Sequence, residues 1–295
     1  MISEHLACTM RAMSRLPIRP AATVAMLCAL LAAGCDSGSS GDTATGATPT
    51  TATTETRPVT SSVAVYLLRD GKVSPVRRTI ESTPAVARAA LTELLKGPTA
   101  DERADGLSSA IPSETALRDI SLSGGVATVD LDGTFDDGGG SASMLGRVAQ
   151  IVATLTRFPT IERVAFRIDG APVEAVGGEG VVVDPPVGRR AIEEQTPQIL
   201  VESPLPGDPV RSPVRLRGTA NVFEATVSID VRGANGKLLK RTFTTATSGT
   251  GTRGTFDTEV ALPDRTGPVT VVAYESSAED GRPLHVVELP LQLVP

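Results

Sequence analysis

Residues 126–169, VATVDLDGTFDDGGGSASMLGRVAQIVATLTRFPTIERVAFRID, decide the fold of the first half of the chain. The opening segment alternates apolar and polar residues, which is typical of a strand. Apolar residues then recur at the spacing of one helix face: Met144, Val148, Val152 and Leu155. Phe158-Pro159 ends this helix, and the alternating segment IERVAFRID follows. A helix between two strands predicts an α/β unit.

The residues before this stretch extend the same domain. VAVYLLR at 63–69 predicts a strand, and Asp70-Gly71 is a strong hairpin signal. Thr83-Pro84 supplies a cap and a first-turn proline for a helix with an apolar face. ALRDISLS at 116–123 predicts another strand. We therefore expect residues 62–184 to form an α/β domain with two helices covering one face of a small mixed sheet.

The second half of the chain has no helical periodicity. Residues 185–197, which begin near Pro185-Pro186, mark a boundary that offers few side chains able to pack two domains together. From Gln198 onward, seven alternating segments are separated by Pro, Gly and Asn-Gly turns. This pattern predicts an all-β immunoglobulin-like sandwich over residues 198–295, held by aliphatic packing without the Cys-Trp-Cys core of antibody domains.

The amino terminus has the pattern of an export signal. Arg11, Arg15 and Arg19 precede an apolar run from Ala21 to Ala33, which is too short to cross a bilayer as a helix. Small residues and then Cys35 follow, an order that resembles the bacterial lipobox. We predict that residues 1–34 are a lipoprotein signal peptide and that Cys35 is lipidated. An ordinary signal with a site of the Ala-x-Ala kind is the alternative.

Residues 35–61 are expected to form the lipidated cysteine and a disordered tether. The segment is built almost entirely of Ser, Thr, Gly, Ala and Pro, so it cannot bury enough apolar surface to fold. A flexible chain of this length reaches about 25–30 Å. The expected location is the extracytoplasmic face of the cell membrane.

Composition excludes several functions. The whole sequence has 28 basic and 34 acidic residues, and the predicted signal contains three arginines and one glutamate of these. The exported chain therefore keeps 25 basic and 33 acidic residues and has a net charge of −8. Nucleic-acid binding is therefore not expected. All three cysteines lie at or before Cys35, and His285 is the one histidine after it, so thiol catalysis and two-histidine metal sites are not expected. No cofactor is predicted.

Several segments of the sequence resemble those of a known family. AVYLLRDGKVSPVRR, ALTELLKGPTADERADGLSSAIP and VATVDLDGTF resemble a GerMN domain, the module of germination and sporulation lipoproteins. ILVESPLPGDPV and GTANVFEATV resemble the immunoglobulin-like domain that accompanies GerMN in spore-germination-type proteins. The resemblance implies an envelope lipoprotein whose modules bind or assemble, and it supplies no catalytic residues.

An acidic run follows the strand at 126–131. Its carboxylates, Asp130, Asp132, Asp136 and Asp137, invite comparison with a calcium loop. However, Thr134, Phe135 and Ser141 stand where that loop needs an oxygen ligand, a glycine and a glutamate. Asp130 and Asp132 could also imitate a glycosidase pair, although few aromatic residues are present to bind a sugar. A solvated acidic turn is the preferred interpretation.

Four residues of the second domain are candidates for interaction. Arg215 and Arg217 share one strand face, and Arg211 lies nearby in the sequence. These arginines could bind an anionic polymer, or their charge could instead prevent an exposed strand from pairing with another chain. Phe223 lies between two strands, where it could serve binding or fill the core. His285 stands in a strand and is expected to be structural.

The preferred function is a non-catalytic, lipid-anchored envelope scaffold or interaction module. Its expected partners are envelope proteins or further copies of the chain, with a cell-wall polymer as another candidate, and the first domain is expected to carry the association. A carboxylate-dependent enzyme acting on peptidoglycan and an accessory modulator of a membrane sensor are the alternatives.

Replacing Cys35 tests the anchor. We expect Cys35→Ala to release the chain from washed membranes, because stable attachment needs more than one acyl chain at about 0.8 kcal/mol per buried methylene. Cys28→Ala, within the predicted signal, is the control and should remain membrane-bound. Unchanged membrane recovery of processed Cys35→Ala protein in cell fractionation would contradict the lipoprotein assignment.

Overall fold

The computed structural model describes residues 59–178, 180–262 and 266–295. The predicted signal peptide, Cys35 and all of the tether before Val59 therefore lie outside the described residues. Within the described part, no helix combines the length and apolar character needed to cross a bilayer.

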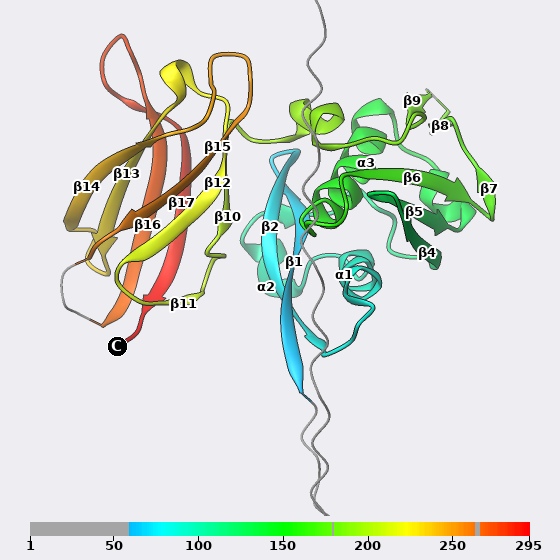
Figure 1. Ribbon diagram of the computed structural model, residues 1–295, viewed down its shortest axis with the longest axis horizontal. Coiled ribbons are helices and arrows are strands. Elements are labelled where there is room, and N and C mark those ends of the chain that lie inside the picture. The colour runs from blue at the N-terminus through cyan, green and yellow to red at the C-terminus, as the bar shows by residue number, and fades with distance from the viewer. Residues whose placement is uncertain (1–58, 179, 263–265) are drawn as a thin grey trace, which may run out of the picture. The chain divides into compact units, whose positions relative to one another are not determined.

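The first domain combines helices and strands, as the sequence predicts (Figure 1). Its strands are β1 (Thr60–Arg69), β2 (Lys72–Glu81), β3 (Leu107–Ser108), β4 (Leu117–Ser123), β5 (Val126–Leu131), β6 (Arg163–Ile168), β7 (Ala171–Pro172), β8 (Ala175–Val176) and β9 (Val181–Val182). Its helices are α1 (Val86–Leu95), α2 (Ala100–Ala104) and α3 (Ser141–Leu155), with 3₁₀ turns η1 (Gly133–Asp136) and η2 (Arg189–Gln195).

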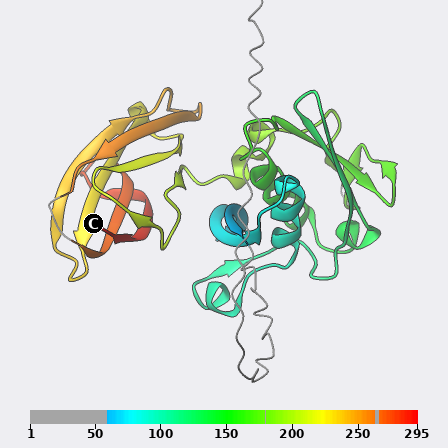
Figure 2. The same cartoon turned by 60° about the horizontal axis from the view of Figure 1, so that its bottom comes forward.

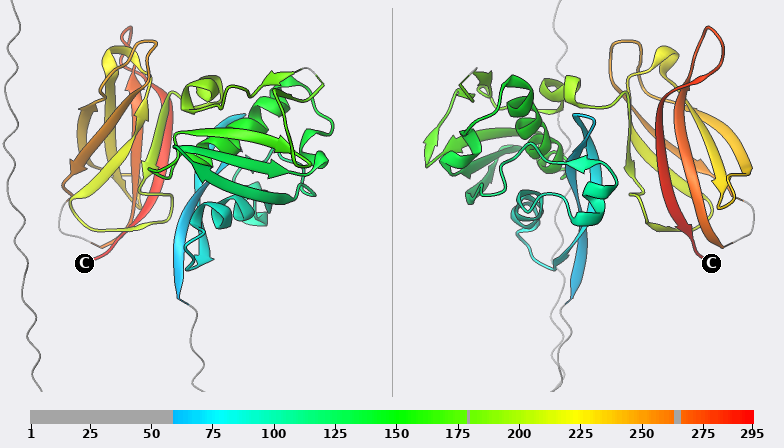
Figure 3. Two further views of the ribbon diagram at one scale, coloured as in Figure 1. Left: turned by 45° about the vertical axis from the view of Figure 1, so that its right-hand side comes forward. Right: turned by 180° about the vertical axis from the view of Figure 1, so that it is seen from behind.

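The strands do not form the single small mixed sheet that the sequence analysis predicts. β2, β1 and β3 form one antiparallel sheet, while β4, β5, β6 and β7 form another in which β5 and β6 are parallel. Figure 3 shows β4–β6 running across the direction of the β1–β2 hairpin. The prediction of two helices on one face of a single sheet is therefore wrong, since α3 is largely buried against β1, β2 and β6.

Polar side chains on α3 bind the backbone of Tyr66 in the middle of β1, on the side of β1 that faces away from β2. Tyr66 in β1 stands opposite Pro75 in a pair of the antiparallel register that exchanges no hydrogen bonds, so the Tyr66 N–H and C=O point away from β2. Gln150 Nε2 donates to the Tyr66 carbonyl at 3.2 Å, and Thr154 Oγ1 accepts from the Tyr66 N–H at 3.0 Å. The helix thus takes the place of a neighbouring strand.

Arg147, one turn before Gln150, fastens the loop that leads into α3. Its guanidinium is almost fully buried and donates to four carbonyl oxygens, those of Ala110, Phe135, Asp137 and Gly138, at 2.5–3.1 Å. A buried guanidinium is costly unless its donors are paired. The position of this loop therefore depends on Arg147.

The second domain is a two-sheet sandwich (Figures 1 and 2). Its strands are β10 (Ile199–Ser203), β11 (Pro209–Val210), β12 (Val214–Ala220), β13 (Thr226–Gly233), β14 (Leu238–Thr245), β15 (Gly254–Val260), β16 (Gly267–Ser276) and β17 (Pro283–Leu293), with a 3₁₀ turn η3 (Phe223–Ala225). One sheet has the order β10-β12-β15 and the other β11-β17-β16-β13-β14. All seven predicted strand segments are present, and the short β11 is additional.

Alternating side chains connect β10 to both hydrophobic cores. Ile199 and Val201 belong to the core of the sandwich, whereas Leu200 between them belongs to the core of the first domain, because successive strand residues point to opposite faces. Ile192 in η2 also joins the first core. The segment after residue 184 therefore packs against the first domain more than its proline-rich start suggests.

Removing the Gln150 amide should destabilise the first domain. Its Oε1 also accepts from the Ala110 N–H at 2.8 Å, so Gln150→Leu leaves that donor and the Tyr66 carbonyl unsatisfied. We expect the free energy of unfolding to fall by about 2–4 kcal/mol. Gln198→Leu, the same exchange at an exposed position, should change it by less than about 0.5 kcal/mol in urea titrations followed by circular dichroism. Equal losses in the two variants would refute this role of α3.

Candidate functional site

Arg215 and Arg217 project together from the outer side of β12, as their spacing predicts. The Asp257 carboxylate on β15 lies between them: it accepts from Arg215 Nε at 2.7 Å and from Arg217 Nε at 3.1 Å. Hydrogen bonds from Arg215 hold the pKa of Asp257 below its usual range. Glu259 stands opposite Arg215 in the strand register, so this face carries carboxylates as well as guanidinium groups.

Arg211 does not join this pair. Its Nε donates to the Pro295 carbonyl oxygen at 2.6 Å, near the end of the chain. The three arginines therefore do not form one continuous cationic surface.

Phe223 lies on η3 at one end of the sandwich, with 50% of its side chain exposed. Its neighbours Val222 and Ala225 are buried. The alternative that Phe223 fills the core therefore does not hold, and the residue presents an aromatic ring at the surface.

Hydrogen bonds fix the backbone that carries this ring. The Phe223 N–H donates to Glu275 Oε1 at 3.2 Å, and the Glu224 N–H donates to Thr250 Oγ1 at 3.1 Å. His285 Nε2 lies 3.6 Å from the other carboxylate oxygen of Glu275. His285 thus has a partner on an adjacent strand, a contact that the sequence analysis did not anticipate.

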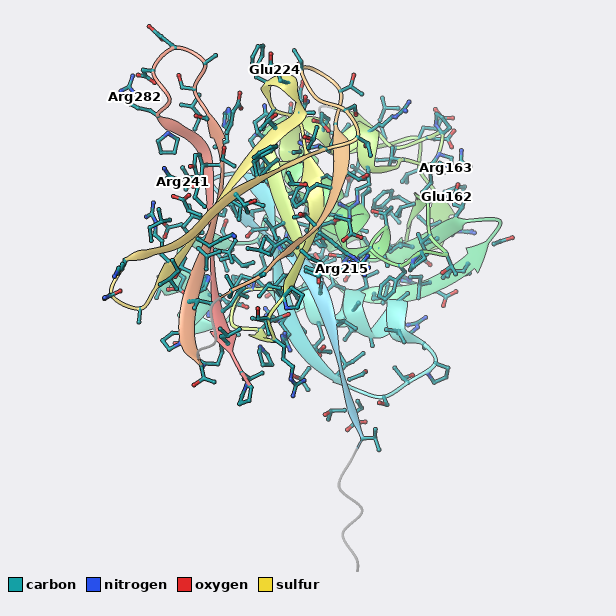
Figure 4. The ribbon with its side chains drawn as sticks, turned by 60° about the vertical axis from the view of Figure 1, so that its left-hand side comes forward. Glu162, Arg163, Arg215, Glu224, Arg241 and Arg282 are labelled. Atoms are coloured by element: carbon teal, nitrogen blue, oxygen red, sulfur yellow. The ribbon has the colours of Figure 1, made fainter. Side chains whose placement is uncertain are left out.

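Backbone conformations that are rare for L-residues gather around the same loop. Glu224, Ala225, Thr250 and His285 all have φ between 50° and 56°. Each such residue costs roughly 1–2 kcal/mol, and such conformations persist where surrounding contacts enforce them. Figure 4 shows Glu224 at the same end of the sandwich as Arg282, in the loop between β16 and β17. This end is the strongest candidate contact surface of the second domain.

The acidic residues at the end of β5 and in the turn after it hold loops together. Three of their carboxylates accept a backbone N–H from another segment: Asp130 from Gly170, Asp132 from Ala116 and Asp136 from Gly177. Within the described ranges, no three His, Cys, Asp or Glu side chains are grouped to bind a metal ion. The three hydrogen bonds give these carboxylates a structural role in joining loops.

The structure also contains a buried polar cluster that sequence reasoning missed. Tyr66 is fully buried, and its hydroxyl donates to Glu202 Oε1 at 2.6 Å. Arg189 lies 2.9 Å from the same oxygen and 5.4 Å from the centre of the tyrosine ring. Burial and the Glu202 carboxylate raise the pKa of Tyr66, so the phenol remains a donor. The cluster joins β1, η2 and β10.

A second ion pair fastens η2 to the sandwich. Arg253 Nε donates to Glu193 Oε2 at 2.8 Å, and its remaining nitrogens donate to the Pro197 carbonyl and the Thr219 hydroxyl. The Asn221 amide donates to the other oxygen of Glu193 at 3.0 Å. These bonds satisfy both charged groups at the start of the second domain.

Comparison with known families confirms the resemblance inferred from the sequence. Residues 64–174 match the Germane family, described as sporulation and spore germination. Residues 198–282 match the Gmad2 family, described as an immunoglobulin-like domain of bacterial spore germination. Neither description names a chemical reaction. Among curated proteins, none matches this chain.

Three solved structures show distant similarity to the chain. The tandem GerMN domains of the sporulation protein GerM from Bacillus subtilis share 16% identity, cover 69% of this chain and have a TM-score of 0.41, while this chain spans 62% of that structure. The first GerMN domain of the same protein shares 22% identity over 44% of this chain and 98% of that one, with a TM-score of 0.37. A putative lipoprotein from Clostridium perfringens shares 18% identity over 46% of this chain and 91% of that one, with a TM-score of 0.35.

The buried cluster predicts a specific loss of stability. Glu202→Gln keeps the shape of the side chain but removes the charge that pairs with Arg189, so we expect the free energy of unfolding to fall by about 1.5–3 kcal/mol. Glu194→Gln is the control, because Glu194 is exposed and its carboxylate has no partner in the described part of the chain. Denaturant unfolding measures both variants, and an unchanged Glu202→Gln transition would show that the cluster adds no stability.

Proposed function

We propose that this chain, which carries a Germane domain followed by a Gmad2 immunoglobulin-like domain, is a lipid-anchored envelope protein that acts as a non-catalytic assembly module in a germination or sporulation system. The lipobox-like sequence before Cys35 supports the anchor, and the composition of the following segment supports a flexible tether. Together they hold the two folded domains at the extracytoplasmic face of the membrane.

The observation that carries the assembly role is the open edge of the second sheet of the Germane domain. β4 is the outer strand of the order β4-β5-β6-β7, and most of its residues are exposed. An unpaired strand edge offers N–H and C=O groups to another chain. Natural proteins usually block such edges with charge, proline or cover, so an unblocked edge favours a role in association.

The second half of β4 lacks those blocking features. Its charged residues, Arg118 and Asp119, lie at the start of the strand and pair with Asp169 and Arg88. The remaining residues, Ile120 to Ser123, are uncharged, and Leu122 is 50% exposed. By contrast, β14 at the edge of the sandwich carries Lys240 and Arg241 within the strand. We therefore assign self-association to β4.

The sandwich supplies a second contact surface in this proposal. Phe223 presents an apolar ring from a loop whose backbone is fixed by Glu275 and Thr250. A rigid aromatic side chain is a common anchor in protein interfaces because it buries much area at low entropic cost. An envelope protein is the proposed partner at this end.

A charge placed on the β4 edge tests self-association. We expect Leu122→Lys to lower the yield of crosslinked homodimer in cells by about fivefold, which corresponds to ~1 kcal/mol, because it places like charges close together across the paired edges. The measurement is in-cell crosslinking of the full chain followed by quantitative blotting.

Leu238→Lys is the matched control, because Leu238 is a 44% exposed leucine on the sandwich edge β14. It should leave the homodimer yield unchanged. Loss of the homodimer in Leu238→Lys with retention in Leu122→Lys would transfer self-association to the sandwich and overturn the assignment to β4.

A further inference from the structure

A crevice of about 340 Å³ lies where the turn after α3, η2 and strands β10, β12 and β15 meet. Its volume is at the lower end of the usual range for ligand pockets, about 300–1,000 Å³. Four arginines line it, Arg157, Arg189, Arg190 and Arg253, together with two glutamates, Glu193 and Glu202. The crevice therefore contains two more cationic than anionic side chains.

Two of the arginines are paired with carboxylates and form part of the crevice wall. Arg189 pairs with Glu202 and also donates to the Thr156 hydroxyl and the Ala153 carbonyl. Arg253 pairs with Glu193 and fills its other donor positions with neutral oxygens. Their charges are balanced within the protein.

The other two arginines are not balanced by a carboxylate. Arg157 makes one long hydrogen bond, 3.5 Å from its NH2 to the Glu202 carbonyl, and is exposed. Arg190 is exposed and its guanidinium has no hydrogen-bond or ion-pair partner among the described residues. Two guanidinium groups from separate segments, neither paired with a carboxylate of the described residues, thus border one crevice in a chain of negative net charge.

This arrangement selects for the charge and shape of a ligand. A guanidinium binds phosphate through two parallel N–H bonds, and walls of low dielectric concentrate the field of the unpaired charges. A terminal phosphate group carries about −1.5 to −2 charge, which matches two free arginines, whereas a single carboxylate carries only one. We infer that this crevice is a binding site for a terminal phosphate or diphosphate group.

Calorimetric titration of the full chain in a neutral detergent tests this site at low salt. Inorganic pyrophosphate represents a soluble phosphate compound, and dihexanoyl phosphatidic acid represents a lipid headgroup. The comparison probes are succinate and dihexanoyl phosphatidylcholine. We expect saturable binding of at least one phosphate probe, and which probe binds identifies the source of the phosphate.

The decisive variant is Arg157→Gln/Arg190→Gln, which breaks no ion pair and should leave the unfolding temperature unchanged. We expect it to weaken phosphate binding by about tenfold or more. The matched control is Arg103→Gln/Arg163→Gln, since Arg103 bonds only to a carbonyl and Arg163 has no side-chain partner in the described ranges. It should bind within about twofold of the unaltered chain.

Three outcomes would overturn the inference. The first is the absence of saturable binding to both phosphate probes. The second is an equal loss of binding in the two double variants, which would indicate general charge attraction. The third is binding of succinate as tight as that of pyrophosphate, which would exclude selection for phosphate.

Discussion

The hydrogen bonds from α3 to the backbone of Tyr66 are the constraint on which the first domain depends. Because the register of β1 and β2 directs the Tyr66 N–H and C=O away from β2, the two backbone groups need partners on the other side of β1, and Thr154 and Gln150 supply them. The helix is thereby held in the interior between separate sheets. In the other sheet of this domain, β4 is the outer strand, and an outer strand offers backbone groups to another chain.

The same residue, Tyr66, extends this constraint into the second domain. Its backbone binds α3 while its hydroxyl binds Glu202 at the end of β10, so one buried residue contacts both elements. Leu200 adds apolar contact with the first core. Arg189 and Arg253 form ion pairs with Glu202 and Glu193. Arg157 and Arg190 are therefore the arginines of the crevice that have no carboxylate partner among the described residues.

Local patterns in the sequence predict most elements but not their partners. Alternation and turn residues are short-range signals, so the seven strands of the sandwich and the helices at 86–95 and 141–155 could be found from them. The contact of Gln150 with the Tyr66 carbonyl could not be found in this way, because a polar side chain on a helix is expected at an exposed position. Tyr66 and Glu202 are 136 positions apart, and nothing local pairs them. Likewise, the outward direction of Arg215 follows from alternation, while its bond to Asp257 requires the strand register.

Four residues without a glycine's conformational freedom have left-handed backbone conformations at one end of the sandwich. A domain with an aliphatic core could close this loop with glycines, yet Glu224, Ala225, Thr250 and His285 adopt left-handed conformations there. Their combined cost must be offset by the core and by the bonds that Glu275 and Thr250 make to the loop. The same loop carries the exposed Phe223. In the proposed membrane-anchored arrangement, even a weak contact through such a ring is effective, because confinement raises the local concentration of partners.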